Sequence, residues 1–275
     1  AGLASIAHRR SGIDPARWRK HVRLGRAGRP SPVIGRPYHR VATMNVRCFT
    51  LGAFQVNAYL LEDPVTGQCA VVDTGDGPQL ANTLMQLDPR PDLRAILLTH
   101  AHFDHAGGLA DLQQSFPDAV TWLPELERPL FDTLPRQGSL LFGMPEFDRP
   151  CGRIDHELRD GDAIDVGQMR FHFLSTPGHT PGQGCYYDDA YVFVGDTLFA
   201  GSIGRTDFPL SDPDLMHASL RRLLALPGLL QVCSGHGPTT TLEQELRRNP
   251  FLDFLRRERG MDEPSGWSLP LGRWN

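Results

Sequence analysis

The stretch from Thr99 to Gly108 constrains the fold and chemistry of this chain more than any other. Three histidines and one aspartate lie within six consecutive residues of it: His100, His102, Asp104 and His105. The apolar run 95–99 before them predicts a short buried strand, and residues 107–116 predict a helix. The four polar side chains therefore belong to a strand-to-helix loop at a sheet edge, where α/β proteins place their chemistry.

The spacing of these four residues favours metal ligation. His100 and His102 are two positions apart, so in extended backbone their side chains point to the same side and can share one ion. Asp104 and His105 lie at the turn into the helix and would face a second position nearby. A His-x-His pair alone is a weak metal signal, but the full string directly after a strand is much stronger. The loop therefore predicts a site for two metal ions.

Three later loops repeat the pattern of a strand followed by a histidine or aspartate beside glycine. The strands and their following residues are 169–174 with His179, 191–194 with Asp196, and 230–233 with His236. His179 alone would be an incidental residue of a turn. Glycine beside the three residues lets the backbone approach another group closely. Four strand ends that each deliver a metal-ligating residue type point to one composite site.

Composition narrows the class of protein. A length of 275 residues with 40% hydrophobic content is ordinary for a globular protein with ample core. The net charge of −4 gives no nucleic-acid footprint, and no apolar run approaches the roughly 20 residues that span a bilayer. The five cysteines are scattered, which suggests free thiols in a reducing compartment. We therefore expect a cytoplasmic protein without nucleic-acid or membrane partners.

The segment Ala1–Thr43 differs from the rest of the chain. It carries ten basic residues against Asp14 as its only acid, and it is rich in glycine and proline. Such a segment can bury little of itself. It is a leader added or translated upstream of a natural start at Met44, an organellar targeting segment, or an arm that lies on the body or on a partner. The first interpretation is favoured, which gives a disordered basic leader over 1–43 and a catalytic domain over 44–275.

From Val46 onward the chain alternates strand and helix signals. The expected elements are strands over 46–51, 57–61, 69–73 and 119–123, a hairpin over 163–174, and helices over 78–87 and 242–259. Asp73 ends a strand next to glycine, where an acid more often braces a loop than ligates a metal. Segment 124–150 is long and apolar, and it either lines a substrate entrance or pads the outside of a sheet.

The candidate residues, in this order and loop setting, resemble those of the metallo-β-lactamase-fold hydrolases over roughly residues 46–259. The stretches Gly195–Phe199, Gly201–Asp207 and Gly235–Thr241 resemble the glyoxalase II-like branch, and within it the short single-domain bacterial type II glyoxalases. The resemblance implies an α/β fold, a four-layer αββα sandwich in which two mixed sheets lie between outer helices.

The resemblance also implies three ligands for a first metal, three for a second and one bridging residue: His100, His102 and His179; Asp104, His105 and His236; and Asp196. A water or hydroxide would form the other bridge, and Asp104 is expected to be catalytic as well. Imidazole and carboxylate ligands suit zinc, iron and manganese alike, and two zinc ions are the leading expectation.

This ligand set implies hydrolysis. Zinc lowers the pKa of bound water from about 15.7 to about 7, so a hydroxide between the metals would attack an acyl carbon while a metal binds the oxyanion. A thiolate leaves readily because the thiol pKa lies near 8.5. The favoured substrate is a glutathione thioester of the S-lactoylglutathione type. Larger glyoxalase II enzymes hold glutathione with basic residues of an added domain. Here Arg205 is the candidate contact, unless it forms a structural pair with Asp207.

Alternative functions remain open from the sequence. The same dinuclear site would serve a lactonase or a β-lactamase, although class B1 β-lactamases carry cysteine where this chain has Asp196. Persulfide dioxygenases, which use one iron, resemble the chain around residues 204–207 but lack part of the second ligand set. A non-catalytic electron-transfer or interaction module would lack a ligand or carry a flavin domain. The sequence does not indicate an oligomeric state.

Overall fold

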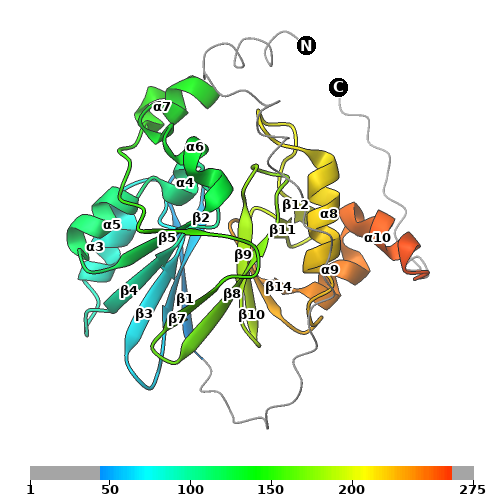
Figure 1. Cartoon of the computed structure of the whole chain (residues 1–275), viewed down its shortest axis with the longest axis horizontal. Coiled ribbons are helices and arrows are strands. Elements are labelled where there is room, and N and C mark those ends of the chain that lie inside the picture. Colours follow the sequence, from blue (N-terminus) through cyan, green and yellow to red (C-terminus); the bar gives the residue numbers. More distant parts are fainter. Residues whose placement is uncertain (1–43, 262–275) are drawn as a thin grey trace.

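Two six-stranded sheets lie face to face between outer helices in the computed structural model of the chain, which describes residues 44–261 (Figure 1). The first sheet has the order β1 (Asn45–Leu51), β2 (Val56–Glu62), β3 (Gln68–Val72), β4 (Asp92–Leu97), β5 (Val120–Pro124) and β6 (His156–Leu158). The second has the order β14 (Thr240–Thr241), β13 (Gln231–Ser234), β10 (Tyr191–Gly195), β9 (Gly184–Tyr187), β8 (Met169–Ser175) and β7 (Ala163–Val166). A small hairpin joins β11 (Leu198–Phe199) to β12 (Ser202–Ile203).

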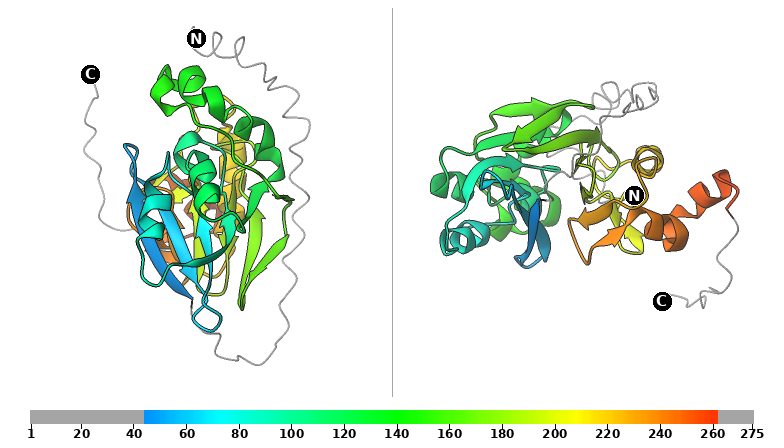
Figure 2. Two further views of the ribbon diagram at one scale, coloured as in Figure 1. Left: turned by 90° about the vertical axis from the view of Figure 1, so that its left-hand side faces the viewer. Right: turned by 90° about the horizontal axis from the view of Figure 1, so that it is seen from below.

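Helices cover the outer face of each sheet, and the short helices that follow β5 lie at one end of the sandwich (Figures 1 and 2). Those of the first half are α3 (Gln79–Met85), α4 (Phe103–Ala106), α5 (Leu109–Ser115), η1 (Glu125–Glu127), α6 (Arg128–Phe131), α7 (Leu134–Gln137), η2 (Gly138–Phe142) and η3 (Pro145–Phe147). Those of the second half are α8 (Pro213–Leu223), α9 (Leu242–Arg248), η4 (Pro250–Leu252) and α10 (Asp253–Glu258). Over residues 44–261, no helix combines the length and apolar character that crossing a membrane requires. The αββα sandwich expected from the sequence is confirmed, whereas the proposed leader over 1–43 lies outside the described residues.

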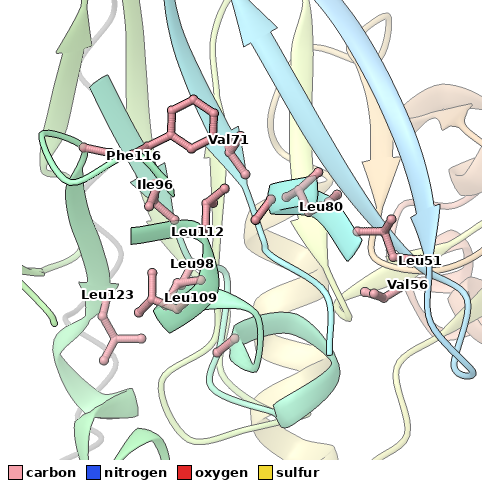
Figure 3. Packing of buried hydrophobic residues seen from close by; sticks show 14 of the residues in the cluster. Leu51, Val56, Val71, Leu80, Ile96, Leu98, Leu109, Leu112, Phe116 and Leu123 are labelled. Carbon is pink, nitrogen blue, oxygen red and sulfur yellow. The ribbon is translucent and has the colours of Figure 1, made fainter. Parts of the chain in front are cut away.

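Strand alternation divides the core into three apolar layers. In β3, Cys69 and Val71 face the helices α3 and α5, while Ala70 and Val72 face the second sheet. Figure 3 shows the outer layer of the first half, where Val71 lies among leucines of both helices and strands. Because both faces of these strands are covered, their sequences are almost continuously apolar.

Parallel pairing gathers the functional loops at one end of the sandwich. Strands β3 to β6 run parallel, as do β10 and β13, so their carboxyl ends lie together. Backbone hydrogen bonds join the two sheets there: Asn57 N–H donates to Gly235 O over 2.7 Å, and Gly184 N–H donates to Thr99 O over 3.0 Å. The loops that carry the candidate residues are therefore fixed to one another by main chain as well as by side chains.

The structure departs from the predicted elements in several places. Strands β6, β9, β11, β12 and β14 have no predicted counterpart. The single helix expected over 242–259 is interrupted between α9 and η4, because Pro250 lacks an N–H and Asn249 caps Phe251 N instead. The helix expected over 107–116 is preceded by α4, a separate turn that already holds Asp104 and His105.

Candidate metal centre

His100, His102 and His179 form the first group of the site. His102 Nδ1 lies 3.2 Å from His100 Nε2 and 3.0 Å from His179 Nε2. All three side chains are buried. Two of them come from the loop after β4 in the first sheet, and His179 comes from the loop after β8 in the second. Tetrahedral ligation of zinc at about 2.0–2.1 Å places ligand nitrogens about 3.3 Å apart, so this spacing suits a small cation.

Asp104, His105 and His236 form the second group. His105 Nε2 lies 3.3 Å from His236 Nε2, and Asp104 Oδ2 lies 3.7 and 3.4 Å from these two nitrogens. The first two residues lie in α4, and His236 follows β13 in the other sheet. Each group therefore takes side chains from both halves of the sandwich, that is, from loops of the first sheet and from loops of the second.

Asp196 lies between the two groups. Its Oδ2 is 3.4 Å from His179 Nε2 and its Oδ1 is 3.3 Å from His105 Nε2. Oδ1 is buried and has no hydrogen-bond partner among the described residues. A Cβ on Gly235 would lie only 2.4 Å from that oxygen and 2.6 Å from His105 Cε1. A buried carboxylate oxygen facing imidazole nitrogens, in a space that one methyl group would fill, fits a bound cation.

The outer ring nitrogens of three histidines donate hydrogen bonds to oxygen acceptors. His105 Nδ1–H donates to Asp73 Oδ2 over 2.8 Å, and His179 Nδ1–H donates to a backbone carbonyl, Arg205 O, over 2.8 Å. His236 Nδ1–H donates to Phe54 O over 3.1 Å. Since these acceptors have no proton to give, Nδ1 carries a proton in each ring, and the neutral form of each ring therefore has its lone pair on Nε2, toward the centre.

Asp73 braces the site, as expected of it. Its Oδ1 accepts from Thr99 N–H over 2.8 Å, and its Oδ2 accepts from His105. The Thr99 hydroxyl also donates to Asp73, so His100 Nδ1–H donates to that hydroxyl over 3.1 Å. Asp73 adopts a left-handed backbone with φ of 58°, a conformation that aspartate tolerates better than most residues. One carboxylate thereby orients His100 and His105, members of different groups.

Burial and neighbouring charges shift the pKa values of the buried side chains in different directions. Burial, together with the surrounding imidazoles, lowers the pKa of His100 well below its usual range and that of His102 to about 3. Burial has the same effect on His105, but nearby carboxylates, led by Asp196, outweigh it and raise its pKa. Burial alone would raise the pKa of Asp196, yet the imidazoles around it, led by His105, lower that pKa. The carboxylates of the centre are thus ionised, as metal ligation requires, and their negative charge is what raises the pKa of His105.

Arg205, the predicted substrate contact, lies beside the first group. Its guanidinium makes two hydrogen bonds of 2.8 Å to Asp207, and its Cζ lies 4.2 Å from the centre of the Phe208 ring. That ring packs edge-on against His102 and His179, with centroid distances of 5.9 and 5.8 Å. The Arg205 side chain is 63% exposed. The ion pair with Asp207, anticipated as an alternative, is present in the structure.

Several residues that hold the site were not singled out from the sequence. Asn57 Nδ2 donates to Ser234 O over 3.1 Å and to Gly237 O over 2.8 Å, on either side of His236. Glu127 and Gln137 bind the backbone of the loop that carries His100 and His102. All three are buried polar side chains. Their only sequence signal is a polar residue inside an apolar stretch, which does not identify a partner.

Comparison with known proteins agrees with this geometry. The model of the Metallo-beta-lactamase superfamily matches residues 51–236. Hydroxyacylglutathione hydrolase GloC of Haemophilus influenzae is 35% identical over 215 residues, covering 76% of this chain and 99% of the relative. The probable metallo-hydrolase YqgX of Bacillus subtilis is also 35% identical, with 76% and 98% coverage.

Solved structures give the same result. BLEG-1, a B3 metallo-beta-lactamase, is 36% identical with a TM-score of 0.69, and the match covers 76% of this chain and all of that one. TTHA1623, solved in a di-iron-bound form, is 41% identical with a TM-score of 0.64, covering 75% of this chain and all of that one. The seven converging side chains, the sandwich and these matches lead to one conclusion: the chain belongs to the metallo-beta-lactamase superfamily.

Proposed function

We propose that this chain is a dinuclear metal-dependent hydrolase that cleaves a glutathione thioester of the S-lactoylglutathione type. Membership of the superfamily makes it a metal-dependent hydrolase. The observation that carries the dinuclear proposal is the position of Asp196, whose two carboxylate oxygens face one nitrogen of each histidine group at 3.3 and 3.4 Å.

The proposed ligands follow the two groups and the residue between them: His100, His102 and His179 for the first ion; Asp104, His105 and His236 for the second; Asp196 for both. When bound, such cations lower the pKa of water toward 7 and polarise an acyl oxygen. Asp73 and the backbone carbonyls of Phe54 and Arg205 keep the imidazoles in the tautomer that such binding needs.

Two considerations support a thioester substrate. GloC, a relative that the chain matches over 99% of its length, is named a hydroxyacylglutathione hydrolase. A thiolate leaving group, with a thiol pKa near 8.5, needs little help from a proton donor, whereas an amide nitrogen needs one. The carboxylates closest to the centre, Asp104 and Asp196, have lowered pKa values and are poor donors near neutral pH. We propose Asp104 as a catalytic residue through its place in the second group.

Zinc is the proposed metal, and iron is the alternative that a relative favours, since TTHA1623 was solved in a di-iron-bound form. The five cysteines have no disulfide partner, which suits the reducing cytoplasm that we propose as the location.

The test is a substrate panel on protein whose metals have been counted. Metal content is measured by plasma mass spectrometry, and turnover is measured with S-lactoylglutathione, a lactone, a β-lactam and glutathione persulfide. We expect two ions per chain and fastest turnover of the thioester. One iron per chain with sulfite production would instead identify a persulfide dioxygenase and refute the proposal.

A β-lactam is the second candidate substrate, favoured by the 36% identity to BLEG-1, a B3 metallo-beta-lactamase, over that whole chain. Faster turnover of the β-lactam than of the thioester in the same panel would select it.

We propose that Arg205 releases its ion pair with Asp207 and binds a carboxylate of the substrate instead. Arg205→Ala should then raise KM for S-lactoylglutathione and leave kcat largely unchanged, while Asp207→Asn frees the guanidinium and should not raise KM. An equal rise in KM in both variants would instead assign a structural role to the ion pair.

A further inference from the structure

The backbone between His100 and Phe103 is held by two buried side chains from segment 124–150. Ala101, which separates His100 from His102, is fully buried, so its N–H and C=O cannot be satisfied by water. Ala101 N–H donates to Glu127 Oε2 over 2.8 Å, and Ala101 O accepts from Gln137 Nε2 over 2.9 Å. Phe103 N–H donates to Gln137 Oε1 over 2.6 Å.

Glu127 also reaches the second sheet. Its other oxygen, Oε1, accepts from Gly182 N–H over 2.7 Å, and Gly182 lies three residues after His179. The approach is close: a Cβ on Gly182 would lie 2.6 Å from Leu126 C and 2.7 Å from Glu127 N. One carboxylate in η1 thus connects the loop of His100 and His102 to the loop of His179.

The residue types match these partners. Glu127 faces a backbone donor at each oxygen, and among side chains of this length only a carboxylate offers two acceptors. Gln137 faces one backbone donor and one backbone acceptor, which only an amide satisfies. An amide at 127 would turn an NH₂ group toward a buried N–H. A carboxylate at 137 would turn an oxygen toward a buried carbonyl.

We propose that Glu127 is a positioning residue for the first metal group, which sets the distance between the His100–His102 loop and the His179 loop, and that Gln137 fixes the loop from its other side. This inference rests on the proposed dinuclear function. It assigns a role to segment 124–150 that neither of the two interpretations drawn from the sequence contained. Neither residue belongs to the candidate ligand groups; each acts through backbone that carries ligands.

The experiment measures zinc affinity at one group at a time, by competition with a chromophoric chelator. His236→Ala leaves the first group to be measured, and His102→Ala leaves the second. Adding Glu127→Gln should weaken zinc binding by about 10–100-fold in the H236A background and by less than about twofold in the H102A background. Gln137→Glu should act in the same direction, and it carries the test if the first variant does not fold.

Two controls separate positioning from general destabilisation. Glu125→Gln changes an exposed carboxylate of the same η1, paired with Arg159, and should leave both affinities unchanged. Asp63→Asn breaks a buried contact at the hairpin turns joining β2–β3 and β7–β8 and should lower stability without changing either affinity. Equal losses at both groups, or an unchanged first group in both E127Q and Q137E, would overturn the inference. A wild-type chain that binds fewer than two zinc ions would refute the proposed function instead.

Discussion

The two halves of the sandwich contribute to the centre in different ways. The first half supplies His100, His102, Asp104 and His105 from six consecutive residues after β4. The second half supplies His179, Asp196 and His236, one from each of three loops. In the first half the spacing of ligands is set by local backbone, namely two extended residues and the turn of α4. In the second half it is set by how β8, β10 and β13 pack.

This difference teaches where each half is vulnerable. A change in the first loop alters ligand spacing directly, whereas a change in the second half acts through strand register and sheet packing. Hydrogen bonds between the halves, such as those of Asn57 to the His236 loop, fix the position of a ligand in one sheet relative to the other sheet. Each half supplies at least one ligand to each group, so removing a ligand from either half should weaken metal binding. The predictions below run from the largest expected effect to the smallest.

The largest effect is expected from removing one ligand of the first group from either half. His102→Ala and His179→Ala should each lower kcat/KM by roughly 10³-fold or more, since bound metal contributes several kcal/mol to the transition state. Circular dichroism should show a retained fold. If one of the two variants keeps wild-type kcat/KM, the halves do not share an ion.

Asp196→Asn should remove both ions, whereas Asp104→Asn should remove only the second. The asparagine loses the charge that faces His105 on one side and His179 on the other. Metal content after gel filtration distinguishes the two outcomes. Retention of one full ion in D196N would contradict a bridging role.

Removal of metal by a chelator should lower stability measurably, because the ions join loops of both halves. At free zinc 100-fold above Kd, each site contributes about 2.7 kcal/mol through binding to the native state alone. Urea unfolding with and without chelator measures the difference. Equal unfolding midpoints in the two conditions would show that the ligands do not converge on bound metal.

The smallest effect is expected from Asp63→Asn, which breaks the contact between the halves at hairpin turns outside the centre. Asp63 is 1% exposed and accepts from Thr66 Oγ1 and Gln168 N–H, both over 2.6 Å. The variant should lose about 1–3 kcal/mol of unfolding free energy with unchanged zinc affinity.

The same variant has a predicted pH signature. Burial opposes ionisation of Asp63, but its hydrogen bonds outweigh burial and lower its pKa below the unfolded value. A lowered folded pKa stabilises the native state fully above the unfolded pKa of about 3.9 and loses that effect as pH falls through the folded pKa. The stability difference between wild type and D63N should therefore shrink below about pH 4. A difference that is constant from pH 6 to pH 3 would contradict this account.

The same contrast between the halves explains how much of the fold and of the candidate site the sequence predicted. The first loop is readable because strand period and helix onset are local properties of 95–116. His179, Asp196 and His236 are weak signals singly and became informative only as a repeated strand-end pattern. The structure brings all seven side chains together, and the sandwich agrees with the fold implied by the resemblance.

What the sequence did not predict depends on long-range backbone contacts. Glu127 binds an N–H that lies 26 residues away, and Asn57 binds a carbonyl 177 residues away. Neither partner has a side-chain signature, since every residue except proline carries both groups. The break of the last helix at Pro250 was readable locally and was missed.

The glycine at position 235 has a consequence for sequence variation. Its missing side chain leaves the space between Asp196 Oδ1 and His105, where a methyl carbon would lie within 2.4 and 2.6 Å of them. A residue that offers no metal ligand therefore limits the space between the candidate ligands. In a saturation library selected for function, we expect this position to accept glycine alone, as strictly as the ligand positions accept histidine and aspartate.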